Sequence, residues 1–319
     1  MKSRKPVDWA EKKTKQKVIV DQRQFLWHED TLEKLAAWMG LRQGMNTLDV
    51  GCGLGYLGQT FWNHFGKNGS YTGLDISLPL LRQALMESPE WARGGAARFV
   101  RGSAANLPFP DNVFDWTACQ TLLMHSAEPD RFLSEMVRVT RPGGVVMCNE
   151  PNNISAIRGD TVNSWSEKTI DQELLRFRVM HHWAQGRKKL GFGDYAIGNR
   201  VPEMMREQGL HHIDIRCNDM VSLLLPPYDT PSSRFRLEQI GKAIEEQEKR
   251  GNRGFRMDRE FRAFYFAGGG TEYTWRKFLA MIRETSARDF SEKKRQFEEG
   301  TLHICPGTCS FFCITGRKP

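Results

Sequence analysis

The sequence predicts an α/β protein with a mostly parallel sheet and helices on both faces. Two observations carry this prediction. Between residues 47 and 149, short apolar runs alternate with segments whose apolar residues recur at helical spacing. A glycine-rich loop also follows the first of these runs directly, which is typical of the turn between a strand and a helix in α/β folds. This β-α-β-α order favours parallel strands joined by helical crossovers.

The individual elements follow from the same two periodicities. Apolar residues at helical spacing, or charged amphipathic patterns, predict helices over 31–39, 78–87, 130–140, 202–208, 232–250 and 271–299. Apolar or alternating runs predict strands over 48–50, 71–76, 98–100, 114–120, 145–149, 213–217 and 309–315. Ser77 is expected to cap the second helix, and the Arg-Pro-Gly-Gly run at 141–144 to end the third.

Composition is typical of an ordinary globular protein. Of the 319 residues, 39% are hydrophobic and 26% are charged, and no run approaches the roughly 18 apolar residues of a membrane span. The charged start lacks the apolar stretch of a secretory signal. Cys52, Cys119 and Cys148 stand in apolar runs, which predicts reduced core thiols and a cytoplasmic location. The net charge of +8 is spread along the chain and predicts a basic but ordinary surface.

Element order also predicts the domain organisation, and no internal repeat is found. The expected parts are an N-terminal helical or flexible segment at 1–30, a core at 31–221 and 306–319, and a helical cap at 222–305, with 155–198 partly in the cap. The segments 155–198 and 222–305 are too long for simple connections. We therefore expect them to cover a substrate.

The glycine loop is the most informative motif. Its glycines, Gly51, Gly53 and Gly55, let the backbone turn sharply and approach a ligand closely. The spacing G-x-G-x-G differs from the G-x-G-x-x-G of dinucleotide folds, and no phosphate-binding Lys-Ser/Thr pair follows it. Asp49 precedes the loop, where a carboxylate would repel a pyrophosphate but suits a ligand with a positive charge.

A second acid stands at the end of the next expected strand. Asp75 comes 20 residues after Gly55, and a carboxylate there can accept both ribose hydroxyls of a nucleoside. The alternative is a surface aspartate that caps the following helix. Loop, strand and acid arrive in the order that a nucleoside site requires, so we favour the first interpretation.

These motifs resemble the class I S-adenosylmethionine-dependent methyltransferases, in particular the small-molecule group that includes the ubiquinone/menaquinone-biosynthesis enzymes. The family's glycine motif matches 49–55, its ribose acid Asp75, its G-D-A-x-x-L-P-F segment 102–109, and its helix ending in P-G-G the run 138–144. The resemblance covers about a third of the chain. It implies a Rossmann-like sheet of seven strands and S-adenosyl-L-methionine as the cofactor.

The resemblance also implies individual donor-site residues. Ile76 falls where an apolar side chain packs on the adenine, and Gln120 where the family places residues near the sulfonium. Ser103 replaces the aspartate that usually accepts a bond from the adenine amino group, and its hydroxyl can accept without charge assistance. Ser103 and Ala104 are therefore kept as adenine-site residues. Tyr56, directly after the loop, completes the expected cofactor-binding set.

Candidate general bases are, in order, His125, Glu150, His181 and His182. His125 closely follows the strand that ends at Gln120, although a histidine there can equally cap a helix or fill the core. The two later histidines lie in the expected cap. No metal site is expected, because Cys305, Cys309 and Cys313 are explained by packed thiols and their spacing differs from that of radical-type clusters.

The expected function is methyl transfer to an O, S, N or C atom of a small organic molecule, by in-line displacement in a capped pocket. Cap aromatics and arginines predict an apolar or aromatic acceptor with an acidic group, held away from water. The alternatives are a methyltransferase of the same fold that acts on nucleic acid or protein, and a non-catalytic protein that retains the fold. No membrane partner is expected, nucleic acid is disfavoured, and the oligomeric state is open.

Overall fold

The computed structural model describes residues 25–87, 95–154, 161–162, 169–217, 223–250, 259–305 and 310–319. The chain forms two compact units, and each is described by itself. We call residues 1–151, 196–220 and 311–319 the sheet unit, and residues 152–195 and 221–310 the helical unit. The N-terminal expectation for 1–24, the segments 155–160 and 163–168, and the residue Cys309 lie outside the described residues.

The sheet unit contains a seven-stranded sheet of order β3-β2-β1-β4-β5-β9-β7. Its strands are β1 (Asn46–Val50), β2 (Ser70–Asp75), β3 (Ala97–Arg101), β4 (Phe114–Gln120), β5 (Thr140–Asn152), β7 (His211–Cys217) and β9 (Ser310–Arg317). The pairs among β1 to β5 are parallel, and β9 is antiparallel to β7. The predicted α/β class with a mostly parallel sheet is confirmed.

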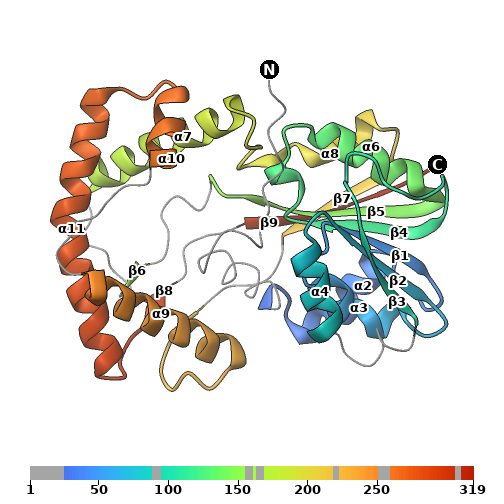
Figure 1. The fold of residues 1–319 in the computed structure, drawn as a ribbon, viewed down its shortest axis with the longest axis horizontal. Helices are drawn as coiled ribbons and strands as arrows, with labels where there is room; N and C mark the ends of the chain where they lie inside the picture. Colours follow the sequence, from blue (N-terminus) through green and yellow to red (C-terminus); the bar gives the residue numbers. More distant parts are fainter. Residues whose placement is uncertain are drawn as a thin grey trace. The chain divides into compact units, whose positions relative to one another are not determined.

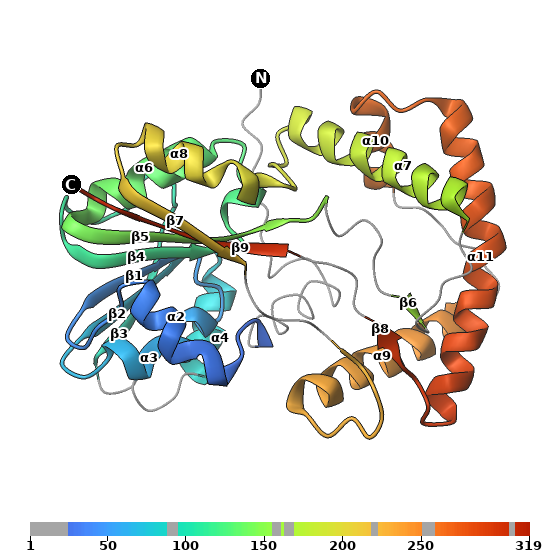
Figure 2. The same ribbon diagram turned by 180° about the vertical axis from the view of Figure 1, so that it is seen from behind.

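Helices cover both faces of this sheet (Figure 1). The helices α2 (Leu32–Trp38), α3 (Tyr56–Phe65) and α4 (Leu78–Glu87) lie on one side, and α6 (Pro129–Val139) and α8 (Val201–Glu207) lie on the other (Figures 1 and 2). Short 3-10 turns, η2 (Glu29–Thr31), η3 (Leu123–His125) and η4 (Ile197–Asn199), stand between them. Apolar side chains from α2, its C-cap residue and α3 pack on the sheet, among them Met39, Phe61 and Phe65, which are at most 1% exposed.

The predicted elements of the sheet unit agree closely with the observed ones. The strand over 114–120 and the helix over 78–87 have the predicted bounds. The run 141–144 does end α6, but its residues continue directly as the start of β5 instead of forming a separate turn. Cys119 and Cys148 are fully buried neighbours on β4 and β5, and their mutual hydrogen bond and burial raise the pKa of the Cys119 thiol.

The helical unit contains four helices among its described residues. These are α7 (Ile170–Lys189), α9 (Pro231–Arg250), α10 (Arg259–Ala267) and α11 (Glu272–Glu298), with a small antiparallel pair of β6 (Thr161–Val162) and β8 (Ile304–Cys305). Two of them, α9 and α11, were predicted within one or two residues of their bounds, whereas α7 and α10 were not predicted as helices. A capping box begins α7: the Thr169 hydroxyl accepts from the Gln172 amide, and the Gln172 side chain accepts from the Thr169 amide.

The helical unit has its own aromatic core. Tyr265, Trp275 and Phe278 are at most 5% exposed and pack with Val179 and Met281. The crossing of α7 and α10 is very close, since a Cβ atom on Gly186 would lie 1.7 Å from the carbonyl oxygen of Phe264. Only glycine fits such a close approach of the two backbones. The helical unit is therefore held together both by packed aromatic side chains and by this close helix crossing.

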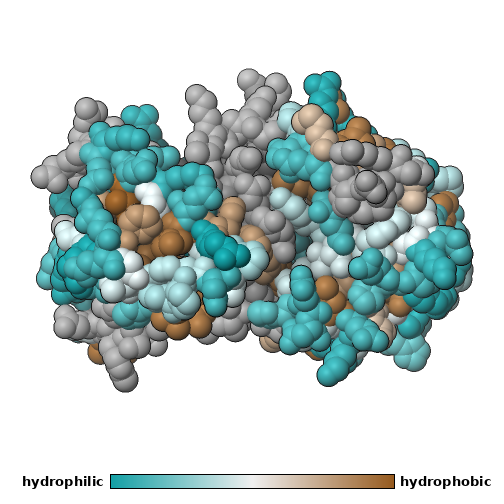
Figure 3. Space-filling view, turned by 90° about the horizontal axis from the view of Figure 1, so that it is seen from below, coloured by the Kyte–Doolittle hydropathy of each residue, from teal (hydrophilic) through white to brown (hydrophobic). Residues whose placement is uncertain are grey.

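The surface of the described residues is largely hydrophilic, with smaller apolar patches, on the face that Figure 3 shows. Exposed large apolar residues include Ile170, Leu174 and Phe177 on α7 and Ile215 on β7. Among the described helices, none combines the length and the apolar character that crossing a membrane demands.

Candidate functional site

Strand register brings the candidate residues of the sheet unit to one edge. Val50, the last residue of β1, pairs with Leu74 on β2 and with Cys119 on β4. Gln120 in turn pairs with Asn149 on β5. The residues that follow these positions therefore meet at the carboxyl edge of the parallel strands, where open α/β sheets bind their ligands.

The glycine loop at this edge has two differently used glycines. Both Gly51 and Gly53 adopt positive φ, at 73° and 54°. A Cβ atom on Gly51 would lie 2.7 Å from Cδ1 of Leu122, so this glycine is required by the packing of the protein itself. A Cβ atom on Gly53 would meet nothing within 4 Å. The open space beside Gly53 is where a ligand can approach the backbone.

Asp75 is fixed beside this open space. Its Oδ2 accepts a hydrogen bond from the Gly53 amide at 2.9 Å, and its Oδ1 accepts one from the Ser77 amide at 2.8 Å. The residue is 9% exposed at the end of β2. Because a carboxylate has about four acceptor positions, it can hold the loop and a ligand together. The glycine loop and Asp75 are thus joined directly by a hydrogen bond, and the ribose-binding prediction needs them to lie side by side in this way.

Asp49 lies below the loop in a buried position, only 1% exposed. Its Oδ2 accepts a hydrogen bond from the Tyr71 hydroxyl at 2.8 Å. Burial raises the pKa of Asp49 from 3.8 to about 7, and the charge of Asp75 adds to this rise, while the Tyr71 bond opposes it. A cation close to Asp49 would stabilise its charged form.

The residues predicted for the adenine side lie on the segments after β2 and β3. Ile76 is 38% exposed directly after Asp75. Ser103 is exposed, and its hydroxyl accepts from the Ala105 amide at 3.3 Å, whereas Ala104 is buried. The Gly102 amide donates to the carbonyl of Asp75 at 3.0 Å and joins the two segments. Tyr56 begins α3 and is half-buried.

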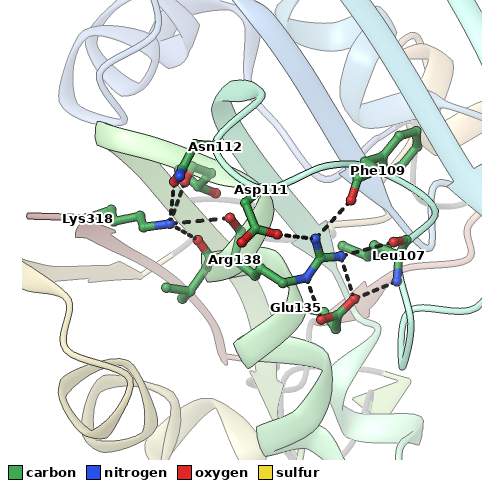
Figure 4. A network of polar contacts seen from close by, with 9 residues as sticks. Leu107, Phe109, Asp111, Asn112, Glu135, Arg138 and Lys318 are labelled. Atoms are coloured by element: carbon green, nitrogen blue, oxygen red, sulfur yellow. Dashed lines mark hydrogen bonds and ion pairs between the residues drawn. The ribbon is translucent and has the colours of Figure 1, made fainter.

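An ion-pair network holds the segment after β3 (Figure 4). Arg138 on α6 binds Glu135 through two nitrogens, at 2.7 and 2.8 Å, and also contacts the carbonyls of Leu107 and Phe109 and the carboxylate of Asp111. Glu135 accepts from the Leu107 amide at 2.7 Å. These bonds raise the pKa of the Arg138 guanidinium and lower that of Glu135. The network anchors 107–111 to α6.

A second support lies at the end of α6 in the same view. The Lys318 ammonium group, near the end of the chain, donates to the carbonyls of Val137 at 2.9 Å and Thr140 at 2.8 Å. It also donates to the side chain of Asn112 at 2.8 Å. Lys318 therefore binds backbone carbonyls at the carboxyl end of α6, which is the favourable place for a cation.

Gln120 lies at the carboxyl end of β4, as predicted. Its side-chain oxygen Oε1 accepts hydrogen bonds from the indole nitrogen of Trp27 and from the side-chain amide of Asn149, both at 3.2 Å. Trp27 was not predicted as a site residue, because it lies 93 residues from Gln120 in a segment without a periodic pattern. No local signal in the sequence joins the two.

Glu150 holds the turn that follows β4. It is fully buried, and its carboxylate accepts from the amides of Leu122 at 2.8 Å, Leu123 at 2.7 Å and Met124 at 3.2 Å. Three such bonds favour a positioning role over that of a general base. His125 ends the same turn and is half-buried, so its place is set indirectly by Glu150.

The other two candidate bases belong to the helical unit. His182 on α7 bonds through Nδ1 to the carbonyl oxygen of Gly268 at 3.0 Å, and its ring lies 5.7 Å from that of Tyr265. His181 is exposed, with its ring stacked on Phe177 at 6.1 Å. His182 thus takes part in the packing of α7 on α10. Within the part of the chain that the structure describes, no three His, Cys, Asp or Glu side chains could hold a metal ion.

Comparison with protein families gives a match over the same region. Residues 48–148 match the family model described as a methyltransferase domain. A demethylmenaquinone methyltransferase of Geobacillus kaustophilus is 35% identical over 134 residues, which cover 42% of this chain and 55% of that protein. The ubiquinone/menaquinone biosynthesis C-methyltransferase UbiE of Hahella chejuensis is 33% identical over 144 residues, 44% of this chain and 56% of that protein. The chain thus spans little more than half the length of these curated relatives.

Solved structures give weaker similarities. The [4+2]-cyclase SpnF matches with a TM-score of 0.48 and 19% identity, over 91% of this chain and 80% of that chain. Phosphoethanolamine N-methyltransferase 2 of Haemonchus contortus, solved with S-adenosyl-L-methionine, matches with a TM-score of 0.46 and 15% identity, over 96% of this chain and 57% of that chain. The fold assignment rests on the strand order of the chain itself.

Proposed function

From the match of residues 48–148 to the methyltransferase-domain family, we propose that this chain is a class I S-adenosylmethionine-dependent methyltransferase that transfers the donor's methyl group to a small organic molecule. One observation carries the proposal: the Gly53 amide binds the Asp75 carboxylate at 2.9 Å, beside open space at Gly53. This arrangement fits a nucleoside whose ribose hydroxyls donate hydrogen bonds to the Asp75 carboxylate while the rest of the ligand passes along the glycine loop.

The acceptor that we propose is a quinol-type aromatic ring. The support comes from the relatives, which are named for methylation of demethylmenaquinone or in ubiquinone/menaquinone biosynthesis. One of those names specifies a carbon atom as the site of methylation. We extend both features to this chain as a proposal, since the alignments cover only part of each relative.

The donor supplies a methyl group on a cationic sulfonium, and this chain's residues would align it with the acceptor and exclude water. Alignment of this kind can lower a barrier by roughly 7–11 kcal/mol. Asp75 would hold the ribose, and Asp49 would place negative charge near the loop. A phenolic or carbon acid must also lose a proton. We propose His125 as the base, since the Glu150 carboxylate already accepts hydrogen bonds from three backbone amides and His182 is bonded to the carbonyl oxygen of Gly268.

A methylation screen tests the proposal. The purified protein is incubated with donor carrying a deuterated methyl group and with quinols, phenols, thiols and amines, and products are read by mass spectrometry. We expect a labelled product from a quinol with the wild type and a strongly reduced yield with Asp75→Ala. Asp130→Ala, an exposed acid on α6, is the matched control and should retain activity. A parallel incubation with RNA or protein as the acceptor tests the alternative class, which a labelled product there and none from the small molecules would favour.

A further inference from the structure

Gln120 is the point where three separate elements of the sheet unit meet. It ends β4, Trp27 reaches it from the segment before η2, and Asn149 reaches it from β5. Both neighbours donate to the same atom, the carbonyl oxygen of the Gln120 side chain, and both distances are 3.2 Å. The side chain is therefore held from two directions.

These two bonds decide which way the Gln120 amide faces. An indole nitrogen can only donate, so the atom facing Trp27 must be the carbonyl oxygen and not the amide nitrogen. The NH2 group of Gln120 is consequently turned away from Trp27 and Asn149. Among the described residues nothing pairs with this nitrogen. Gln120 thus offers hydrogen-bond donors at the carboxyl edge of the sheet.

Trp27 is well placed to impose this orientation. Its side chain is 8% exposed, and its ring packs edge-on against Phe61 of α3, with centroids 5.2 Å apart. Asn149 is fully buried, and in the described part of the chain its Oδ1 has no hydrogen-bond partner. A buried acceptor of this kind is costly, which indicates that the polar cluster lacks a hydrogen-bond donor, such as the ammonium group that stands beside the carboxylate of an amino acid.

We propose that Trp27 is a positioning residue of the donor site, which orients Gln120 so that its NH2 group binds the carboxylate at the amino acid end of the donor. The inference rests on the proposed function and adds a residue that lies outside the matched domain. A carboxylate is the group that fits, because Gln120 presents donors only, and hydrogen bonds to a charged acceptor are about twice as strong as neutral ones.

The test compares two donors on four proteins by calorimetric titration. The donors are S-adenosylmethionine and its decarboxylated analogue, which lacks only the carboxylate. The proteins are the wild type, Trp27→Phe, Gln120→Leu and the double variant. Phenylalanine keeps an aromatic ring against Phe61 and removes the N–H group. For the wild type we expect at least about tenfold tighter binding of S-adenosylmethionine than of the analogue.

Trp27→Phe is expected to weaken S-adenosylmethionine binding about fivefold to tenfold and to leave the analogue within about twofold. The double variant should bind like Gln120→Leu alone, because Trp27 acts through Gln120. Trp62→Phe, on α3 beside Phe65, is the control for loss of an indole and should change neither affinity. Thermal unfolding of each variant confirms that it is folded.

Two results would overturn the inference. One is a folded Trp27→Phe variant that discriminates between the donors as the wild type does. The other is an equal loss of affinity for both donors, which would make Trp27 a packing residue only. A wild type that binds neither donor would contradict the proposed function itself, and the inference with it, so the two failures are distinguishable.

Discussion

The sheet unit and the helical unit use their distinctive side chains in opposite ways. In the sheet unit, Asp75 and Gln120 stand at strand ends, each held by hydrogen bonds that fix its orientation, and Asp75 lies beside the open space at Gly53. In the helical unit, Tyr265 and Trp275 pack on one another, with ring centroids 5.0 Å apart. The comparison shows that rich aromatic content does not by itself indicate a binding pocket. Fixed polar groups beside unfilled space are the stronger sign.

The largest expected effect separates the stability of the helical unit from donor binding. Tyr265 is fully buried, and its hydroxyl both donates to and accepts from the Thr271 backbone at 3.0 Å. Tyr265→Ala should therefore lower the free energy of unfolding by about 3–5 kcal/mol, measured in denaturant. Donor affinity at low denaturant should stay within about twofold.

The matched control for that variant is Tyr273→Ala, because Tyr273 is 68% exposed on α11. It should cost less than about 0.5 kcal/mol. If Tyr265→Ala instead weakened donor binding tenfold while the protein remained folded, the two units would not be independent, and the comparison would fail.

The next effect concerns the glycine loop. Gly53→Val should weaken donor binding at least about a hundredfold, because the new side chain fills the open space in which a ligand can approach the Gly53 backbone. The protein should still fold, since a Cβ atom there meets nothing within 4 Å. Calorimetric titration and thermal unfolding measure the two effects.

Gly209→Val is the control for backbone strain. Gly209 also has positive φ, 76°, and open space around its Cβ position, but it lies outside the proposed site. It should lose as much stability as Gly53→Val and keep its donor affinity. Equal donor affinity in the two valine variants would make the loop a turn and nothing more.

A smaller effect is expected at the ribose acid. Asp75→Ala removes charge-assisted hydrogen bonds and should weaken donor binding by about tenfold to a hundredfold. Part of this loss would come from the loop, because Asp75 also binds the Gly53 amide. Asp75→Asn keeps one acceptor oxygen and should fall between the wild type and the alanine variant. Unchanged affinity in a folded Asp75→Ala variant would exclude the proposed donor site.

The smallest effect is a pH dependence due to Asp49. Its pKa is raised from 3.8 to about 7, so the stabilising contribution of the protonated form is complete below pH 3.8 and is lost as the pH rises through 7. A cationic donor prefers the charged form, so binding should release protons and tighten from about pH 6 to about pH 8, by at most about tenfold per pH unit.

Calorimetry in two buffers of different ionisation enthalpy measures this proton release. Asp49→Asn cannot titrate and should abolish both the release and the pH dependence of affinity. A wild type whose donor affinity stays constant over the same pH range would show that Asp49 is not linked to the donor.

The sheet unit could be predicted well because its signals are local. The glycine loop, the strand before it and Asp75 follow one another within a short segment, and each can be recognised by residue type or spacing. Trp27 has no such pattern around it, since its partner Gln120 is 93 residues away and the contact depends on the assembled sheet. The role of Glu150 was likewise hidden, because its bonds go to backbone amides, which have no sequence signature.

The helices α7 and α10 escaped prediction for physical reasons. Helix α7 is apolar on two faces: Ile170 and Phe177 are exposed, while Val179 is buried. No single apolar stripe therefore stands out from its sequence. Its contact with α10 depends on Gly186, a residue that local rules treat as unfavourable in a helix but that the close crossing requires.

The central claim is that the donor binds at the carboxyl edge of β1 and β2, and a crystal structure of the protein with S-adenosylhomocysteine tests it most directly. We predict that the ribose hydroxyls lie within hydrogen-bond distance of the Asp75 carboxylate and that the ligand passes beside Gly53. A ligand bound elsewhere on the chain, with no contact to the Asp75 carboxylate, would contradict the account.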